Sequence, residues 1–288
     1  MKIASNILTL LSATLLSAVQ PSAAPQSLSA AQPSAVLLPA VQPSAALLSA
    51  VQPSAAPQSL SATEIVRRAD DNRRGKNSYS EITMTIVRPT WTRDIRFKAW
   101  AKGNDYSLTL ITSPAKEKGQ AFLKRQKDLW NWQPSINRMI KMSSSVMGQS
   151  WMGSDFTNDD MVRESSTVND YTHELAGTEK VREHDCYKVI LTPKEEAAVV
   201  WGKVITWIST TDFVDIKSEF YDEDDELINT MNAYDIKQYG ARRLPSRMEV
   251  VPADKPNQKT VMTVEKYDFD LAIEESFFSQ QNMQRLSR

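Results

Sequence analysis

YSEITMTIVRPTWTRDIRFKAWAKG, residues 79–103, decides the fold class of this 288-residue chain. In its first half, apolar Ile82, Met84 and Ile86 alternate with polar residues, and after a Pro-Thr pair the same alternation resumes. A period of two places successive side chains on opposite faces of a β-strand. The stretch therefore predicts two neighbouring strands with one apolar face and one polar face.

The same period continues toward the C-terminus, interrupted by short turn-like clusters. Further strand-like runs occupy residues 105–113, 119–143 in short pieces, 187–193, 198–210, 213–223, 226–240, 243–252 and 259–270. We expect about ten or eleven sequential strands in an antiparallel meander. Because no β-α-β alternation and no glycine-rich phosphate loop appear, Rossmann and P-loop enzymes are excluded.

Two segments at the ends of this region have helical character. Residues 64–74 carry apolar side chains at helical spacing, with Thr63 as the expected N-cap and Gly75 as the expected C-cap. Residues 274–286 read as a closing helix. A closing helix fits poorly with an outer-membrane barrel, so a sheet with one wet face and one apolar face is the better interpretation.

The N-terminal region differs from the rest in composition. Lys2 precedes the uncharged apolar run 7–19, which is the layout of a signal peptide, and we assign it to residues 1–24. Residues 25–62 are rich in Pro, Ala and Ser and contain an unchanged copy of part of the preceding sequence, so they predict a disordered tether. We therefore expect an exported, periplasmic protein.

The remaining body, residues 63–288, is expected to form one domain. With 34 basic and 35 acidic residues, the chain has a formal net charge of −1, which gives no electrostatic footprint for nucleic acid. The chain contains only His173, His184 and Cys186 as histidine or cysteine ligands, too few for a Cys/His zinc site, and no metal or cofactor is expected. Cys186 lies in a strand-like run and is expected to be a buried structural thiol.

Methionine and aromatic residues concentrate within residues 119–165. Residues 143–160 (SSSVMGQSWMGSDFTNDD) are too polar for a strand and too apolar for a solvated loop. They predict either a flap that lays its side chains over the concave face of the sheet or a loop pinned to an ordinary core. Met and Trp together suit a surface that accepts ligands of variable shape.

Three segments carry a resemblance to a known family. MGQSWMGSDFTNDDMV (147–162), LWNWQPSINRMIKM (129–142) and RLPSRMEV (243–250) resemble the outer-membrane lipoprotein-sorting proteins related to LolA, in the longer branch of the family. The resemblance implies an incomplete antiparallel β-barrel, a curved half-barrel sheet whose concave hydrophobic face is covered by a few helices.

The resemblance also implies a function. Family members shelter the acyl chains of lipoproteins, or other lipids, in the periplasm between an inner-membrane transporter, of ABC or RND type, and an outer-membrane acceptor. No catalytic residue is implied. The expected cavity and flap residues are Trp100, Phe122, Trp130, Trp132, Met139, Met147, Trp151, Met152, Phe156 and Trp207. Asp155, Asp159 and Asp160 are expected to anchor the flap, or alternatively to cap a helix.

Two other functions compete with lipid carriage. The first is an interaction module that docks an RND-type exporter. The second is a lipid hydrolase built on Ser150, in Gly148-Gln149-Ser150-Trp151-Met152-Gly153. That motif is one residue longer than the GxSxG nucleophile elbow and lacks its strand–turn–helix setting, so the hydrolase is the weakest of the three interpretations.

Overall fold

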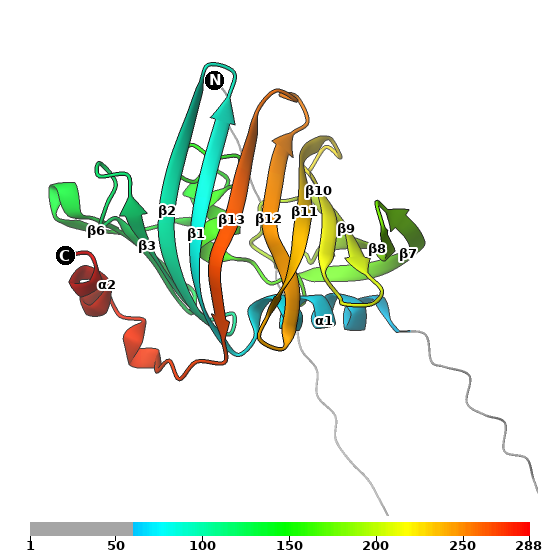
Figure 1. Cartoon of the computed structure of the whole chain (residues 1–288), viewed down its shortest axis with the longest axis horizontal. Helices are drawn as coiled ribbons and strands as arrows, with labels where there is room; N and C mark the ends of the chain where they lie inside the picture. The colour runs from blue at the N-terminus through cyan, green and yellow to red at the C-terminus, as the bar shows by residue number, and fades with distance from the viewer. Residues whose placement is uncertain (1–59) are drawn as a thin grey trace, which may run out of the picture. The chain divides into compact units, whose positions relative to one another are not determined.

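A single antiparallel sheet of thirteen strands dominates residues 60–288, the part of the chain that the computed structural model describes (Figure 1). The predicted signal peptide and nearly all of the predicted tether lie outside the described residues. The strands are β1 (Asn77–Arg88), β2 (Trp91–Lys102), β3 (Tyr106–Ser113), β4 (Ala121–Arg125), β5 (Asp128–Gln133), β6 (Arg138–Lys141), β7 (Tyr171–Val181), β8 (His184–Pro193), β9 (Lys203–Ser209), β10 (Asp215–Tyr221), β11 (Leu227–Tyr239), β12 (Arg242–Pro252) and β13 (Lys259–Phe269).

The sheet consists of two meanders joined at one strand pair. The spatial order is β6-β5-β4-β3-β2-β1-β13-β12-β11-β10-β9-β8-β7, so the first and last strands of the chain lie side by side at the centre. Ile82 pairs with Val264 there, next to a bulge in β13. Because β6 and β7 remain unpaired edges, the sheet is an incomplete barrel, as predicted.

One of the thirteen strands, β7, lies outside all the predicted runs for an identifiable reason. Residues 171–181 form β7, an edge strand whose side chains are mostly exposed on both faces and therefore show no apolar alternation. The predicted strand 198–210 begins later, at Lys203, because the preceding residues form a loop.

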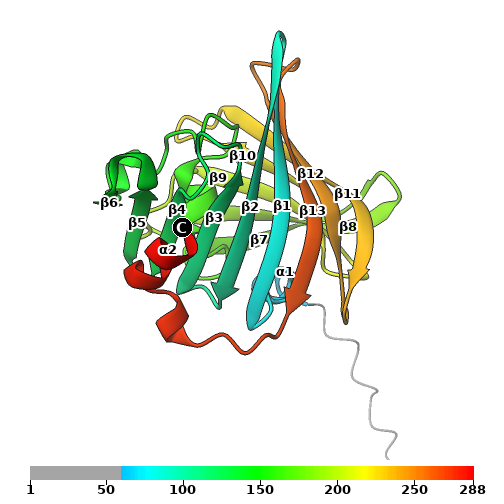
Figure 2. The same ribbon diagram turned by 60° about the vertical axis from the view of Figure 1, so that its left-hand side comes forward.

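The helices lie on opposite faces of the sheet. α1 (Ala62–Arg74) packs against the inner, concave face, whereas α2 (Gln280–Leu286) packs against the outer face (Figure 2). The cap of α1 is Ser61, two residues before the predicted Thr63, while Gly75 ends the helix as predicted. The predicted closing helix 274–286 is divided into a short 3₁₀ turn, η4 (Glu275–Phe277), and α2.

The apolar core is divided by the sheet. The inner face carries two clusters, one around Met84, Phe97 and Trp151 and one around Ile65, Leu191 and Trp201. The outer face carries a cluster that α2 covers and a smaller one around Cys186, which is buried as predicted. Among the described residues, no helix is both long enough and apolar enough to cross a membrane.

Candidate functional site

A cavity of about 350 Å³ lies on the inner face of the sheet, between α1, the end of the flap and strands β1 and β7–β13. This volume is at the low end of the roughly 300–1,000 Å³ typical of ligand pockets. Most of its lining is apolar. The apolar lining includes Val66, Ala69, Ile82, Phe156, Met161, Tyr171, Leu191, Trp201, Val204, Ile208, Phe220, Met231, Ala233, Leu244, Met248, Val250, Met262 and Val264.

Helix α1 forms one wall of this cavity. Ile65, Val66 and Ala69 recur at helical spacing and are buried against the sheet, while the opposite side of the helix is charged. At the start of the helix, the Ser61 hydroxyl accepts a hydrogen bond from the backbone N–H of Glu64 at 3.2 Å. Such a cap stabilises a helix by about 1 kcal/mol. Apolar packing therefore holds α1 against the sheet. The hydrogen bond from its own N-cap stabilises the helix without any contact with the sheet.

A buried arginine connects α1 to the segment that follows the flap. Arg74 contacts Asp70 through Nε at 2.8 Å and Glu164, the residue that ends η3 (Asp159–Arg163), through Nη1 at 2.7 Å. Burial lowers the pKa of Arg74, but the two carboxylates outweigh it and hold that pKa above its usual value. The contact, which we call the Arg74 bridge, closes one side of the cavity with charged groups instead of apolar ones.

The flap, residues 143–160, is itself anchored in the core by its largest side chain. Trp151 is fully buried, and its ring lies 5.5 Å from the rings of Phe97 and Phe122. Met147 is buried in the same cluster. The sequence left two interpretations open, a flap over the concave face and a loop pinned to the core, and each describes part of the segment. The flap covers the inner face, and its middle is a pinned part of the core.

Asp155 ties the flap to the central strands. Its carboxylate accepts two hydrogen bonds from the Arg88 guanidinium, both at 3.0 Å, and one from the Thr260 hydroxyl at 2.6 Å. Arg88 lies on β1 and Thr260 on β13, so one carboxylate connects the flap to both strands of the central pair. A bidentate arrangement of this kind is strong and geometrically specific.

The other two aspartates act around η3. Asp160 accepts hydrogen bonds from the Thr157 backbone N–H at 2.7 Å and from the Trp201 indole at 3.0 Å, and its own N–H donates to the Thr157 hydroxyl. The reciprocal pair with Thr157 is a capping box. Burial raises the pKa of Asp160. Asp159 accepts from Arg163 and Ser165.

The structure separates the ten expected cavity residues into three groups. Phe122, Met147, Trp151, Met152 and Phe156 belong to the inner face, and of these only Phe156 lines the cavity. Trp100, Trp130, Trp132 and Met139 pack in the outer cluster with α2, and Trp207 lies in the cluster around Cys186. The structure therefore does not form a single cavity lined by all ten residues.

The expected residues lie on two faces because successive side chains of a strand point to opposite sides of the sheet. Phe122 pairs with Asn131 and Thr109 across the sheet, whereas Trp130 and Trp132 pair with Leu123 and Ala121. Directly paired residues share a face, and successive residues do not. The two tryptophans of β5 therefore point away from Phe122 and toward the outer face.

Comparison with known proteins places this geometry in a family. A family model described as an uncharacterized protein matches residues 103–285, and no curated protein matches the chain. A DUF1329 family protein from Desulfovibrio piger has a TM-score of 0.71 and 24% identity, over 77% of this chain and 98% of its own. A LolA superfamily protein from Nitrosomonas europaea has a TM-score of 0.68 and 25% identity, over 78% of this chain and 100% of its own. The chain belongs to the LolA-like family. A lipoprotein-sorting protein domain from Vibrio parahaemolyticus shares the same fold, with a TM-score of 0.70 and 21% identity, over 78% of this chain and 98% of its own.

In this LolA-like chain, most of the cavity lining comes from residues that sequence reasoning missed. Strands β8–β13 supply it through ordinary alternating side chains such as Leu191, Val204, Met231 and Val264. Their period-two pattern was readable, but nothing in it distinguishes a residue beside a cavity from one in a filled core. Trp201 was assigned to a strand and instead lies in the loop before β9.

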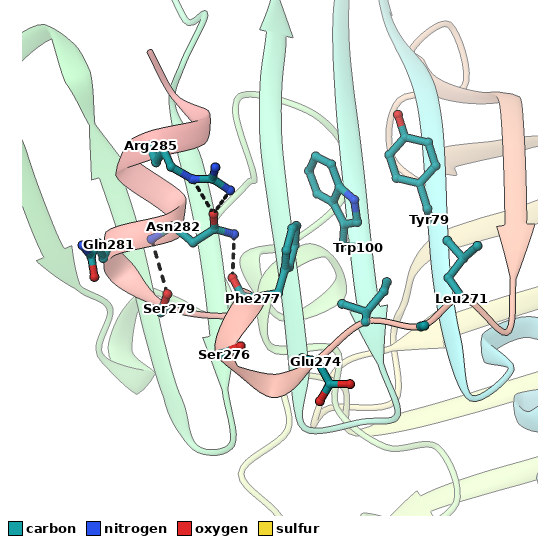
Figure 3. A pocket seen from close by; sticks show the side chains of 12 residues that line it. Tyr79, Trp100, Leu271, Glu274, Ser276, Phe277, Ser279, Gln281, Asn282 and Arg285 are labelled. Carbon is teal, nitrogen blue, oxygen red and sulfur yellow. Dashed lines mark hydrogen bonds between the residues drawn. The ribbon is translucent and has the colours of Figure 1, made fainter.

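The LolA-like sheet also carries an open groove on its outer face, with a volume of about 890 Å³. In this groove Trp100 lies between Tyr79 and Phe277, with ring-centroid distances of 5.2 Å and 5.5 Å (Figure 3). Polar groups of α2, among them Asn282 and Arg285, form the opposite side. The groove is thus an aromatic strip next to hydrogen-bonding side chains.

The candidate nucleophile of a hydrolase is engaged elsewhere in this LolA-like structure. The Ser150 hydroxyl donates to the carbonyl of Ser154 at 2.5 Å, and the His173 ring contacts Thr63 and Thr167 instead. Within residues 60–288 there is no group of three or more His, Cys, Asp or Glu side chains that could hold a metal ion. The inner cavity therefore stands as the candidate functional site, suited to holding an apolar ligand.

Proposed function

We propose that the protein is a periplasmic carrier that binds the acyl chains of lipoproteins or other lipids in the inner cavity and ferries them between the inner and outer membranes. The observation that carries this proposal is the apolar cavity enclosed between α1, the end of the flap and the sheet. The LolA-like fold supports the same reading. The donor would be an inner-membrane transporter of ABC or RND type, and the receiver an outer-membrane acceptor.

The energetics of burial constrain how such a carrier works. Each buried CH₂ contributes about 0.8 kcal/mol, so a sheltered acyl chain is held strongly against water. Release therefore requires a destination that is as apolar as the cavity, such as a membrane or an acceptor with its own cavity. The volume of about 350 Å³ suits a single slender chain, so a multi-chain anchor requires the cover to open further.

The cover is built in a way that permits such opening. The Arg74 bridge joins α1 to Glu164 through one ion pair, and the Glu164 side chain is 27% exposed, so water can solvate this carboxylate when the two elements separate. By contrast, Trp151 and Asp155 fix the flap to the core and to the central strands. We therefore expect the side of the cavity between α1 and η3 to open while the flap stays in place.

Lipid identification from protein isolated from the periplasm tests the proposal. Ala233 lines the cavity and is buried, so Ala233→Phe places a ring in the space that the ligand would occupy. The matched control is Ala253→Phe, at an exposed turn. We expect wild-type protein and the control to retain co-purified lipid and Ala233→Phe to lose most of it, as measured by mass spectrometry. Absence of lipid from correctly folded wild-type protein would sink the proposal.

A second candidate, docking to an exporter, is favoured by the outer groove. Its aromatic strip is accessible and stands apart from the cavity. If docking is the function, Trp100→Ala reduces capture of the transporter in a pull-down while Ala233→Phe leaves it intact. The opposite pattern, with lipid lost and capture unchanged, favours the carrier.

A further inference from the structure

A β-bulge in β10 turns one acidic side chain into the cavity. Asp215 pairs with Ile208, but the next pair is Lys217 with Trp207, so the register shifts between them. Lys217 and Trp207 lie together on the outer face in a cation–π contact. In an unbroken strand Asp215 would share the face of Lys217, and the extra residue places it on the inner face instead. Bulges commonly re-aim a side chain in this way.

Asp215 meets two hydroxyl groups on the cavity floor. The Thr206 hydroxyl donates to Asp215 Oδ1 at 3.1 Å and lies 3.1 Å from the Ser218 hydroxyl. All three residues line the cavity, and both hydroxyl-bearing residues are buried. Apolar Val204, Ile208 and Phe220 surround them. These three polar side chains therefore lie together among apolar neighbours, and we call them the Asp215 cluster.

The Asp215 cluster has unused hydrogen-bonding capacity. Within residues 60–288, Asp215 Oδ2 has no hydrogen-bond donor, and the nearby Arg73 of α1 makes its ion pair with Asp70 at 2.8 Å. Burial raises the pKa of Asp215, as expected for a carboxyl group without a salt bridge. Because Asp215 lines the cavity, a ligand there can supply the missing hydrogen-bond partner.

We infer that the Asp215 cluster is a subsite for a hydroxyl group on the carried lipid. This inference rests on the proposed function and deepens it by naming the ligand class: an amphiphile that places one hydroxyl inside the cavity. A hydroxyl both donates and accepts, which matches a carboxylate oxygen beside the Ser218 hydroxyl.

Binding of dodecanol and of dodecyl methyl ether to the purified protein tests the subsite. The two probes share the alkyl chain and the oxygen, but only the alcohol donates a hydrogen bond. An added hydrogen bond corresponds to up to about tenfold in affinity. We expect wild-type protein to prefer the alcohol by that factor, and Asp215→Leu to lose the preference while still binding both probes.

Asp224→Leu, the same substitution in the exposed turn before β11, is the matched control and keeps the preference. Thermal unfolding verifies that each variant is folded. Equal affinity of the wild-type protein for the two probes, or a preference that survives in Asp215→Leu, overturns the subsite and leaves lipid carriage standing. If neither probe binds and the periplasmic protein carries no lipid, the subsite and the proposed function are both overturned.

Discussion

Asp155 concentrates the attachment of the flap in a single side chain. Its carboxylate is 9% exposed, and its partner Arg88 is 13% exposed, so the pair is largely shielded from water. Removing one partner of a buried pair leaves the other charge uncompensated, which costs more than the pair itself contributes. The residue therefore affects the stability of the flap and of the central strands together.

Asp155→Ala is expected to lower the free energy of unfolding by about 3 kcal/mol, because Arg88 and the Thr260 hydroxyl both lose their acceptor. Urea unfolding followed by circular dichroism measures the change. The control is Asp254→Ala, whose carboxylate is 70% exposed beside Lys255 and whose loss should change little. A change below about 1 kcal/mol for Asp155→Ala would show that the flap does not depend on this contact.

At the scale of single residues, the sequence predicted the apolar character of a region better than the face of the sheet on which each side chain lies. The composition of residues 119–165 correctly indicated a dense apolar region, and Trp151 lies at the centre of an inner-face cluster. It did not indicate that Trp130 and Trp132 point outward, because their side depends on pairing with β4. Asp215 escaped notice altogether, since only the bulge in β10 brings it to the cavity.

At the scale of elements, the charged side of α1 contributes to the stability of the helix. Glu64 accepts hydrogen bonds from Arg67 and Arg68, and these lower its pKa from 4.5 to about 2. Burial raises the pKa of Asp70, but the charges of Arg73 and Arg74 outweigh it, so its pKa also lies below the usual value. Both carboxylates therefore stabilise the folded state in their ionised form.

Acidification is expected to weaken α1 over a defined range of pH. The contribution of Glu64 is fully present above about pH 4.5 and is lost as the pH falls through about 2, because its folded-state pKa is depressed. Glu64→Gln should thus have a lower Tm than wild-type protein at neutral pH, with the difference shrinking as pH falls through that range. Thermal unfolding at several pH values measures it. A difference in Tm that stays constant down to pH 2 contradicts the expectation.

The sequence predicted the elements that have one buried and one exposed face, and it did not predict the elements that are exposed on both faces. Strands such as β1, with one buried face, display their period directly in the sequence. β7 has no such face, so its polar sequence reads as a loop until pairing with β8 defines it. η3 was likewise unreadable, since its start depends on a capping box within the flap.

For the whole molecule, the decisive contact is the pairing of β1 with β13. Local periodicity gives the two meanders but does not indicate which of their edges meet, because the paired strands lie at opposite ends of the described chain. That pairing places the two halves of the sheet around one inner face. It also hides two strand edges that would otherwise template aggregation.

Truncation tests this arrangement. A chain ending at residue 258 lacks β13 and exposes the edges of both β1 and β12, so we expect it to be insoluble. A chain ending at residue 270 keeps all thirteen strands and loses the cover that η4, Phe278 and α2 provide over the outer cluster. We expect it to remain soluble with a lower Tm. A soluble, monomeric chain ending at 258 would contradict this expectation.

The same strand pair also sets the order of events while the chain is being made. β1 is synthesised before its central partner β13, and the other eleven strands are made between them. Throughout that interval β1 has an unfilled edge, and long-range β pairings of this kind form slowly. A chaperone that binds unfolded chains would protect this edge until β13 is available, and the completed sheet then no longer offers it.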